Sequence, residues 1–122
     1  MWEVATTTDF DEWFAELDDA VHIEIIAKVT LLKQLGRRLS RPHADTLHAS
    51  RHPNMKELRA DTADKVMRIA FAFDPHRSAI LLIGGNKTGI SERLFYRQLI
   101  QRADRLYDEH LAAIEPRKKK DR

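Results

Sequence analysis

The chain has 122 residues, of which 43% are hydrophobic and 33% are charged, with a net charge of +2 and a sequence pI near 9.0. This size predicts one domain with a single core, and so small a net charge makes the placement of basic residues more informative than their sum. Cysteine is absent, which excludes disulfides and thiolate sites. No signal peptide or membrane-length apolar run is readable, so we expect a cytoplasmic protein without membrane contact.

The N-terminal part predicts a strand and two helices. Residues 2–6 favour a short strand, and Thr8 is the expected N-cap of the first helix. Asp18 and Asp19 begin a second helix, which Gly36 ends. Apolar residues recur at helical spacing in both segments: Phe10, Trp13, Phe14 and Leu17, then Val21, Ile25, Val29 and Leu32. The short connection predicts an antiparallel helical hairpin.

Residues 37–54 show no periodicity and predict a long surface connection, with one short helical or strand piece near residues 44–48. Loops of this length in compact domains are often functional. His43, His48 and His52 lie in this segment, but two prolines interrupt it and Asp45 is the one nearby carboxylate. We therefore expect no metal site here.

The second half predicts a strand meander and a closing helix. Residues 55–60 and 65–73 have strand patterns, a turn at residues 74–77 joins the second of them to an apolar strand at 79–83, and Ser91 with Glu92 opens the helix. Its expected end is Glu115–Pro116, before a basic, disordered tail at residues 116–122. The whole order predicts one α+β domain over residues 1–115, with helices packed on one face of a mostly antiparallel sheet of about four strands.

Basic residues gather on the sheet face that these helices would leave open. Alternation places Arg59 beside Glu57 on that face, and Arg68 on the adjacent strand, with Lys87 at the end of the central strand. Guanidinium groups on such a face could hold phosphate oxygens and stabilise charge during phosphodiester cleavage. The alternative is a solvated face, or pairing of Arg68 with an acid such as Glu57 or Asp61. Spacing alone leaves both interpretations open.

Three short motifs carry a resemblance to a known family. The run ELR at 57–59, the strand MRIAFAFD at 67–74 and the GGNK at 84–87 before a helix are similar to the RelE/ParE toxin superfamily, and most resemble its phage-type HigB-like toxins. The resemblance covers nearly the whole chain and implies a RelE-like fold. It also implies a type II toxin, paired with a helix-turn-helix antitoxin (HigA-like), that cuts mRNA on the translating ribosome without metal or cofactor.

The same resemblance implies site residues. Arg68 matches the family's strand arginine, and Arg59 and Lys87 match further basic positions, which makes these three the expected catalytic residues. It also makes Tyr96 the nearest counterpart of a base-stacking aromatic. Apart from the resemblance, we expect Lys56 on the strand at 55–60, and His76 and Arg77 in the turn at 74–77, to contact RNA as well.

One departure from the family pattern leaves the general base open. Glu57 stands where cleaving members often carry a lysine, so either Glu57 or His76 could take that role. The alternatives for function are a ParE-like gyrase inhibitor, which needs no nuclease residues, and a non-catalytic RNA-binding or protein-binding module.

Overall fold

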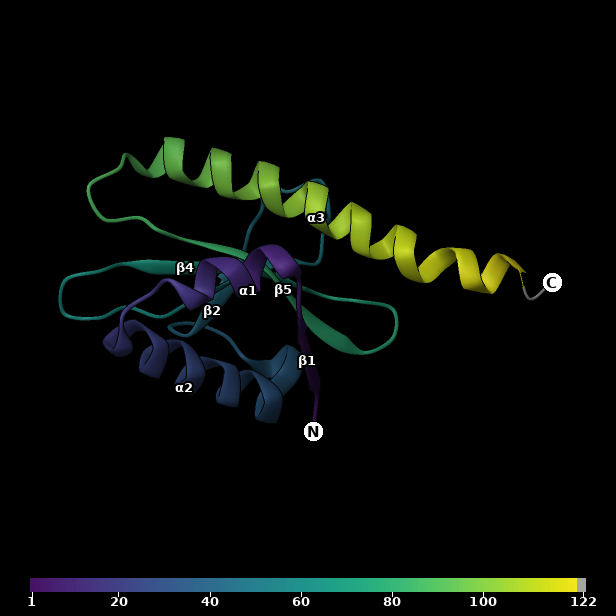
Figure 1. Cartoon of the computed structure of the whole chain (residues 1–122), viewed down its shortest axis with the longest axis horizontal. Helices are drawn as coiled ribbons and strands as arrows, with labels where there is room; N and C mark the ends of the chain where they lie inside the picture. Colours follow the sequence, from purple (N-terminus) through teal and green to yellow (C-terminus); the bar gives the residue numbers. More distant parts are fainter. Residues whose placement is uncertain (121–122) are drawn as a thin grey trace.

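The structure is a computed structural model that describes residues 1–120, with side chains described for residues 1–114. It is an α+β fold, as predicted (Figure 1). The elements in chain order are β1 (Glu3–Thr6), α1 (Thr8–Ala15), α2 (Asp19–Leu35), a 3-10 turn (Gly36–Arg38), β2 (Ala44–Thr46), β3 (Met55–Arg59), β4 (Met67–Phe73), β5 (Ser78–Asn86) and α3 (Glu92–Lys120).

The strands form one five-stranded sheet in the order β1-β5-β4-β3-β2. β1 pairs with β5 in parallel, and the other three pairings are antiparallel, so the prediction of a mostly antiparallel sheet is confirmed. The fifth strand, β2, comes from the segment where a short helical or strand piece was expected. The β3–β4 register places Arg59 directly opposite Arg68.

Side-chain caps define the first two helices. Thr7, not Thr8, caps α1: its backbone is extended, and its hydroxyl accepts from the Phe10 amide at 2.9 Å. The same hydroxyl donates to the carbonyl of Leu82 at 2.6 Å, which ties the cap to β5 and explains why the earlier threonine has this role. Asp18 caps α2, and Gly36 ends it with a φ of 54°, as predicted. In Figure 1, α1 and α2 run in opposite directions, as the short connection predicts.

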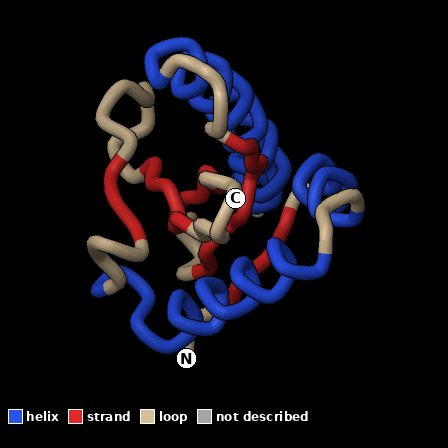
Figure 2. Tube along the Cα trace, turned by 90° about the vertical axis from the view of Figure 1, so that its left-hand side faces the viewer, coloured by secondary structure: helices blue, strands red, loops and turns tan. Residues whose placement is uncertain are grey.

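Helices cover both faces of the sheet, which corrects the expectation of one open face. Figures 1 and 2 show α2 along one side and α3 along the other. The physical reason is that all seven residues of β4 are buried, so neither of its faces can meet water. Each face has its own apolar cluster, with Ile25, Leu32, Leu58, Ile69 and Phe71 on the α2 face and Ala70, Ala72, Ile80, Leu82, Leu99 and Ala103 on the α3 face.

The last elements lie where they were expected, but β5 continues beyond the expected residue 83 to Asn86, and α3 is longer than predicted. The turn at residues 74–77 joins β4 to β5 as a hairpin, as predicted, and Arg77 has a positive φ of 66°. α3 continues past the stop expected at Glu115–Pro116 and reaches Lys120, while residues 121–122 of the expected tail lie outside the described residues. Within residues 1–120, none of the helices combines the length and the apolar composition that crossing a bilayer requires.

Candidate functional site

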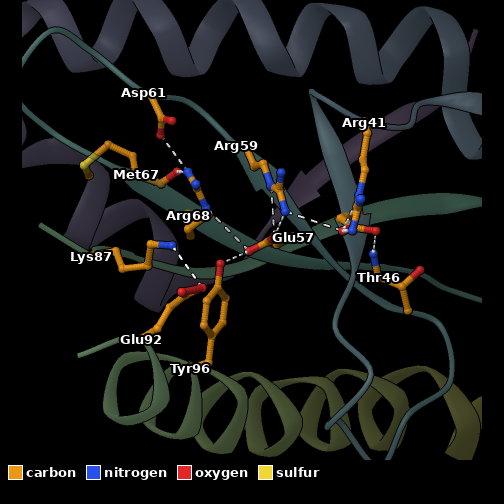
Figure 3. A network of polar contacts seen from close by, with 11 residues as sticks. Arg41, Thr46, Glu57, Arg59, Asp61, Met67, Arg68, Lys87, Glu92 and Tyr96 are labelled. Atoms are coloured by element: carbon orange, nitrogen blue, oxygen red, sulfur yellow. Dashed lines mark hydrogen bonds and ion pairs between the residues drawn. The ribbon is translucent and has the colours of Figure 1, made fainter. Parts of the chain in front are cut away.

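The carboxylate of Glu57 is the centre of a buried polar cluster between β3 and α3 (Figure 3). Its side chain is 4% exposed. The hydroxyl of Tyr96, from α3, donates to Glu57 Oε1 at 2.6 Å, and Arg59 Nε donates to Glu57 Oε2 at 3.0 Å. Strand alternation puts Glu57 and Arg59 on the same face of β3, and the small Ala70 opposite Glu57 leaves room for these long side chains.

Arg68 contributes a second, deeper cation from β4. Its side chain is 8% exposed, and Nη1 donates to Asp61 at 2.6 Å and to the carbonyl of Met67 at 2.8 Å. Arg68 Nε is buried without a hydrogen-bond partner, 3.7 Å from Glu57 Oε1. Burial disfavours the charged guanidinium, but the hydrogen bond to Asp61 helps to keep the pKa of Arg68 above its ordinary value. The group therefore stays charged beside Glu57, and its buried Nε donor is unused.

Tyr96 and Lys87 close the cluster on the side of α3. Burial, together with the hydrogen bond to Glu57, raises the pKa of Tyr96 to about 12, so its hydroxyl is a neutral donor at physiological pH. Lys87 follows β5, and its ammonium lies 5.4 Å from the centre of the Tyr96 ring and 3.5 Å from Glu92 Oε1. The Lys87 ammonium, the Tyr96 hydroxyl and the Glu57 carboxylate thus form a row in space from the end of β5 to the middle of β3.

An open groove of about 270 Å³ gives this cluster access to solvent. We call it the central groove; its walls are Thr46, Leu47, His48, Ala49, Glu57, Arg59, Glu92, Tyr96 and Ile100. Arg59 is 30% exposed there, and its Nη2 also lies 3.4 Å from Asp45, which pairs with Arg41 at 2.8 Å. Side-chain exposure in the network therefore increases from the buried Glu57 and Arg68 to the exposed Arg41. Arg59 is the cation that lines the groove.

Some of the predicted site residues lie together around Glu57, and others lie elsewhere in the molecule. Arg59, Arg68, Lys87 and Tyr96 all lie around Glu57. The alternative of pairing between Arg68 and Glu57 or Asp61 also holds, because both contacts are present. The structure therefore confirms the pairing of Arg68, while the binding of phosphate by these residues stays a prediction.

His76, Arg77 and Lys56 lie elsewhere. The first two belong to the β4–β5 turn, which is about 17 Å from Arg68 along β4, because a strand rises about 3.3 Å per residue. Arg77 instead lies over the ring of Trp2, 5.3 Å from its centre. His76 is therefore too distant to be the general base of this site. Lys56 alternates onto the α2 face, where its ammonium lies 3.4 Å from the hydroxyl of Thr46.

Two contributors carried no readable signal in the sequence. The bond between Tyr96 and Glu57 joins residues 39 positions apart, and no local pattern predicts it. The segment 46–49 forms one wall of the groove only because β2 pairs with β3 and brings it there. The loop histidines form no cluster: among the described residues no group of three metal-ligating side chains is found, His43 contacts Lys28 at 2.8 Å, and His52 pairs with Asp108 at 2.8 Å.

Comparison with known proteins adds the family. Residues 12–108, which include every residue of the Glu57 cluster, match the family described as phage-derived protein Gp49-like (DUF891). The chain belongs to this Gp49-like family. Its similarity to phage-type HigB-like toxins, inferred above from three motifs, is thereby confirmed and is supported by two relatives.

Both relatives of this Gp49-like chain are proteins of Mycobacterium tuberculosis. One, named "Putative toxin HigB2", is 41% identical over 111 residues, which cover 90% of this chain and 55% of that protein. The other, named "Putative toxin HigB3", is 40% identical over 103 residues, which cover 84% of this chain and 88% of that protein. The chain therefore spans about half the length of HigB2 and most of HigB3.

A solved structure, that of the conserved hypothetical protein HP0894 from Helicobacter pylori, is similar to the Gp49-like chain at a low level. The TM-score is 0.46 and the sequence identity is 16%, over 70% of this chain and 94% of that one. This similarity is too low to carry an argument about the site.

Proposed function

We propose that this protein is the toxin of a type II toxin–antitoxin system and that it cleaves mRNA on the translating ribosome. The observation that carries the proposal is the gathering of Arg59, Arg68, Lys87 and Tyr96 around Glu57 beside an open groove. The names of the two M. tuberculosis relatives, which are 40% and 41% identical, support the toxin assignment.

The proposed reaction uses no metal. The 2′-hydroxyl of one nucleotide attacks the adjacent phosphorus, the bond to the 5′-oxygen breaks, and the products are a 2′,3′-cyclic phosphate and a 5′-hydroxyl. Such a site needs a proton acceptor, a group that stabilises the charge on the phosphorane, and a proton donor for the leaving oxygen. Arg59 stabilises the charge on the phosphorane, because it is the partly exposed guanidinium in the central groove and its planar fork suits phosphate oxygens.

Glu57 is the proton acceptor in this proposal, and Lys87 donates the proton to the leaving 5′-oxygen. Glu57 lines the groove. Lys87, 20% exposed, is the ammonium beside the Tyr96 ring. Arg68 acts as a positioning residue. It is buried and lies next to Glu57, so it holds the carboxylate in place and does not itself contact the phosphate. Tyr96 donates to the same carboxylate oxygen, Glu57 Oε1, and offers its ring for stacking to a base.

The proposal also implies a partner protein and a cellular location. A toxin of this kind is neutralised by a cognate antitoxin, for which a helix-turn-helix protein is the expected class, and its target is found in the cytoplasm. No cofactor takes part in the proposed reaction.

Controlled expression in a bacterium, with primer extension on a translated reporter mRNA, tests the proposal. Wild type should arrest growth and cut the reporter only where it is translated, and Arg59→Ala should lose both effects. Arg41→Ala is the matched control, because it removes the same charge from an exposed arginine of the same network. Growth arrest with intact mRNA would overturn the proposal, and a supercoiling assay would then test the gyrase alternative.

A further inference from the structure

A second groove, of about 550 Å³, adjoins the central groove along α3. We call it the helix groove; it is lined by Ala49, Arg51, Arg93, Tyr96, Arg97, Ile100, Gln101 and Asp104. Ala49, Tyr96 and Ile100 belong to both grooves. A chain that lies in the central groove can therefore continue into the helix groove without leaving the surface.

One stripe of α3 supplies most of the helix groove. Arg93, Tyr96, Arg97 and Ile100 are spaced at i, i+3, i+4 and i+7, which places them on one side of the helix. Arg93 and Arg97 are exposed, and neither belongs to an ion pair within the part of the chain that the structure describes. Their positive charge is thus presented to the groove. Arg51 differs, because it pairs with Asp104 and Asp108.

The position of these two arginines is unfavourable for folding. Like charges at i and i+4 repel each other, and Arg93 lies in the first turn of α3, where the helix dipole already provides partial positive charge. Such an arrangement concentrates positive potential at one place, and an anionic ligand relieves it.

The groove combines this charge with a less polar floor. Tyr96 is partly buried and Ile100 is buried, and both face the cavity between the arginines and the segment at residue 49. A basic wall beside an aromatic floor is the combination that binds single-stranded nucleic acid, since phosphates meet the arginines while bases stack on the ring. A folded duplex would keep its bases away from Tyr96.

We propose that the helix groove binds the single-stranded RNA segment that flanks the cleaved phosphodiester, with Arg93 and Arg97 on its phosphates. The two residues are about 6 Å apart along the helix axis, since each residue rises 1.5 Å. The inference rests on the proposed function for the identity of the strand as substrate. Its binding part stands on the helix groove alone.

Fluorescence anisotropy with a labelled single-stranded oligoribonucleotide, measured over a range of salt concentrations, tests the binding part. The variants are the double substitution Arg93→Ala with Arg97→Ala, and a matched double substitution, Arg102→Ala with Arg105→Ala. The control removes the same charge from the same helix but leaves Arg93 and Arg97 in place; Arg102 and Arg105 pair elsewhere, with Asp9 and Glu109. Alanine favours helix, so neither pair should reduce folding.

Loss of two phosphate contacts should lower the salt slope of binding by about 1.4, which is roughly a 25-fold weaker affinity at 0.1 M salt, whereas the control should change the affinity less than about threefold. Equal affinities of the two double variants would overturn the inference, as would a wild type that does not bind the oligonucleotide. An acidic protein segment would then be the remaining occupant, and capture of the cognate antitoxin that fails only for the Arg93 and Arg97 variant would identify it.

Cleavage on programmed ribosomes separates this inference from the proposed function. If wild type cuts and the Arg93 and Arg97 variant cuts equally well at limiting concentration, the helix groove is not used and the inference is overturned while the function stands. If wild type binds RNA through this groove but never cuts, the proposed function fails and the binding inference stands.

Discussion

The two faces of the sheet are both covered by a helix, yet their interiors differ. Beneath α2 the interior is apolar, with Ile25, Leu32, Leu58, Ile69 and Phe71 in one cluster. Beneath α3 the interior is apolar only along part of the helix, and near its N-terminal end it holds Glu57, Arg68 and Tyr96. The same strands build both, since Leu58 is the next residue after Glu57 on β3.

This difference separates the residues that serve packing alone from the residues that the proposed function uses. Buried ion pairs contribute little net stability compared with well-packed apolar groups, because desolvation offsets their attraction. A cluster of two arginines, a glutamate and a tyrosine is therefore not explained by folding. Its opening to the central groove gives it access to a ligand.

Removing the central carboxylate should have the largest effect. Glu57→Ala leaves the buried Arg68 with its contacts to Asp61 and to the carbonyl of Met67 but without the Glu57 carboxylate, and it leaves the Tyr96 hydroxyl without its acceptor. We expect the free energy of unfolding, measured with urea, to fall by about 3–5 kcal/mol, as when one partner of a buried ion pair is lost. A loss below about 1 kcal/mol would show that water already satisfies this cluster.

The apolar face should give a similar loss of stability with a different effect on function. Leu58 is fully buried, and Leu58→Ala should lower the free energy of unfolding by about 3 kcal/mol through the cavity that it leaves. At a temperature where the variant is folded, RNA cleavage per folded molecule should stay near the wild-type level. Loss of cleavage in fully folded Leu58→Ala protein would remove the distinction between the two faces.

A smaller change tests the link between the cluster and α3. Tyr96→Phe removes the hydroxyl that donates to Glu57 and should cost about 1–3 kcal/mol at pH 8. Because the folded protein raises the pKa of Tyr96 from 10.0 to about 12, this stabilisation is complete below pH 10 and is lost as the pH rises through 12. The stability difference between wild type and Tyr96→Phe should therefore shrink between pH 10 and 11. A constant difference over that range would contradict the role of the hydroxyl.

The rim of the network should matter least for stability. Arg41 is 75% exposed and pairs with Asp45 at 2.8 Å. Arg41→Ala should change the free energy of unfolding by less than about 1 kcal/mol, as is usual for exposed ion pairs. A larger loss in urea denaturation would mean that the buried cluster extends to Asp45 and that the central groove is less open than its lining indicates.

Most of the fold could be predicted from the sequence because local signals determine it. Asp18 and Gly36 bound α2 by a cap and a positive φ, and the alternation in residues 67–73 defines β4. The wrong expectation of an open face came from placing the helices on one side of the sheet, which left Arg68 on the other side as a surface residue. The alanines beside it, Ala70 and Ala72, are fully buried, and their small size is what lets α3 approach the sheet.

The site could be predicted only in part, because local patterns in the sequence bring only some of its residues together. Arg59 and Arg68 share a face by alternation, so their proximity is readable in the sequence. The approach of Tyr96 from α3 depends on how a helix packs across the sheet, and no pattern in the chain encodes that packing locally. His76 and Arg77 were placed at the site because they follow β4, but a strand of seven residues separates its two ends too far.

The chemistry of the cleaved ends tests the central claim most directly. Purified ribosomes, programmed with an mRNA of defined sequence, would be incubated with the wild-type protein, and the ends of the fragments would be determined. The account predicts a 2′,3′-cyclic phosphate and a 5′-hydroxyl, and no cleavage when the attacking nucleotide carries 2′-deoxyribose. Fragments with a 5′-phosphate, or equal cleavage of the 2′-deoxy substrate, would contradict a site that works through Glu57 and Arg59.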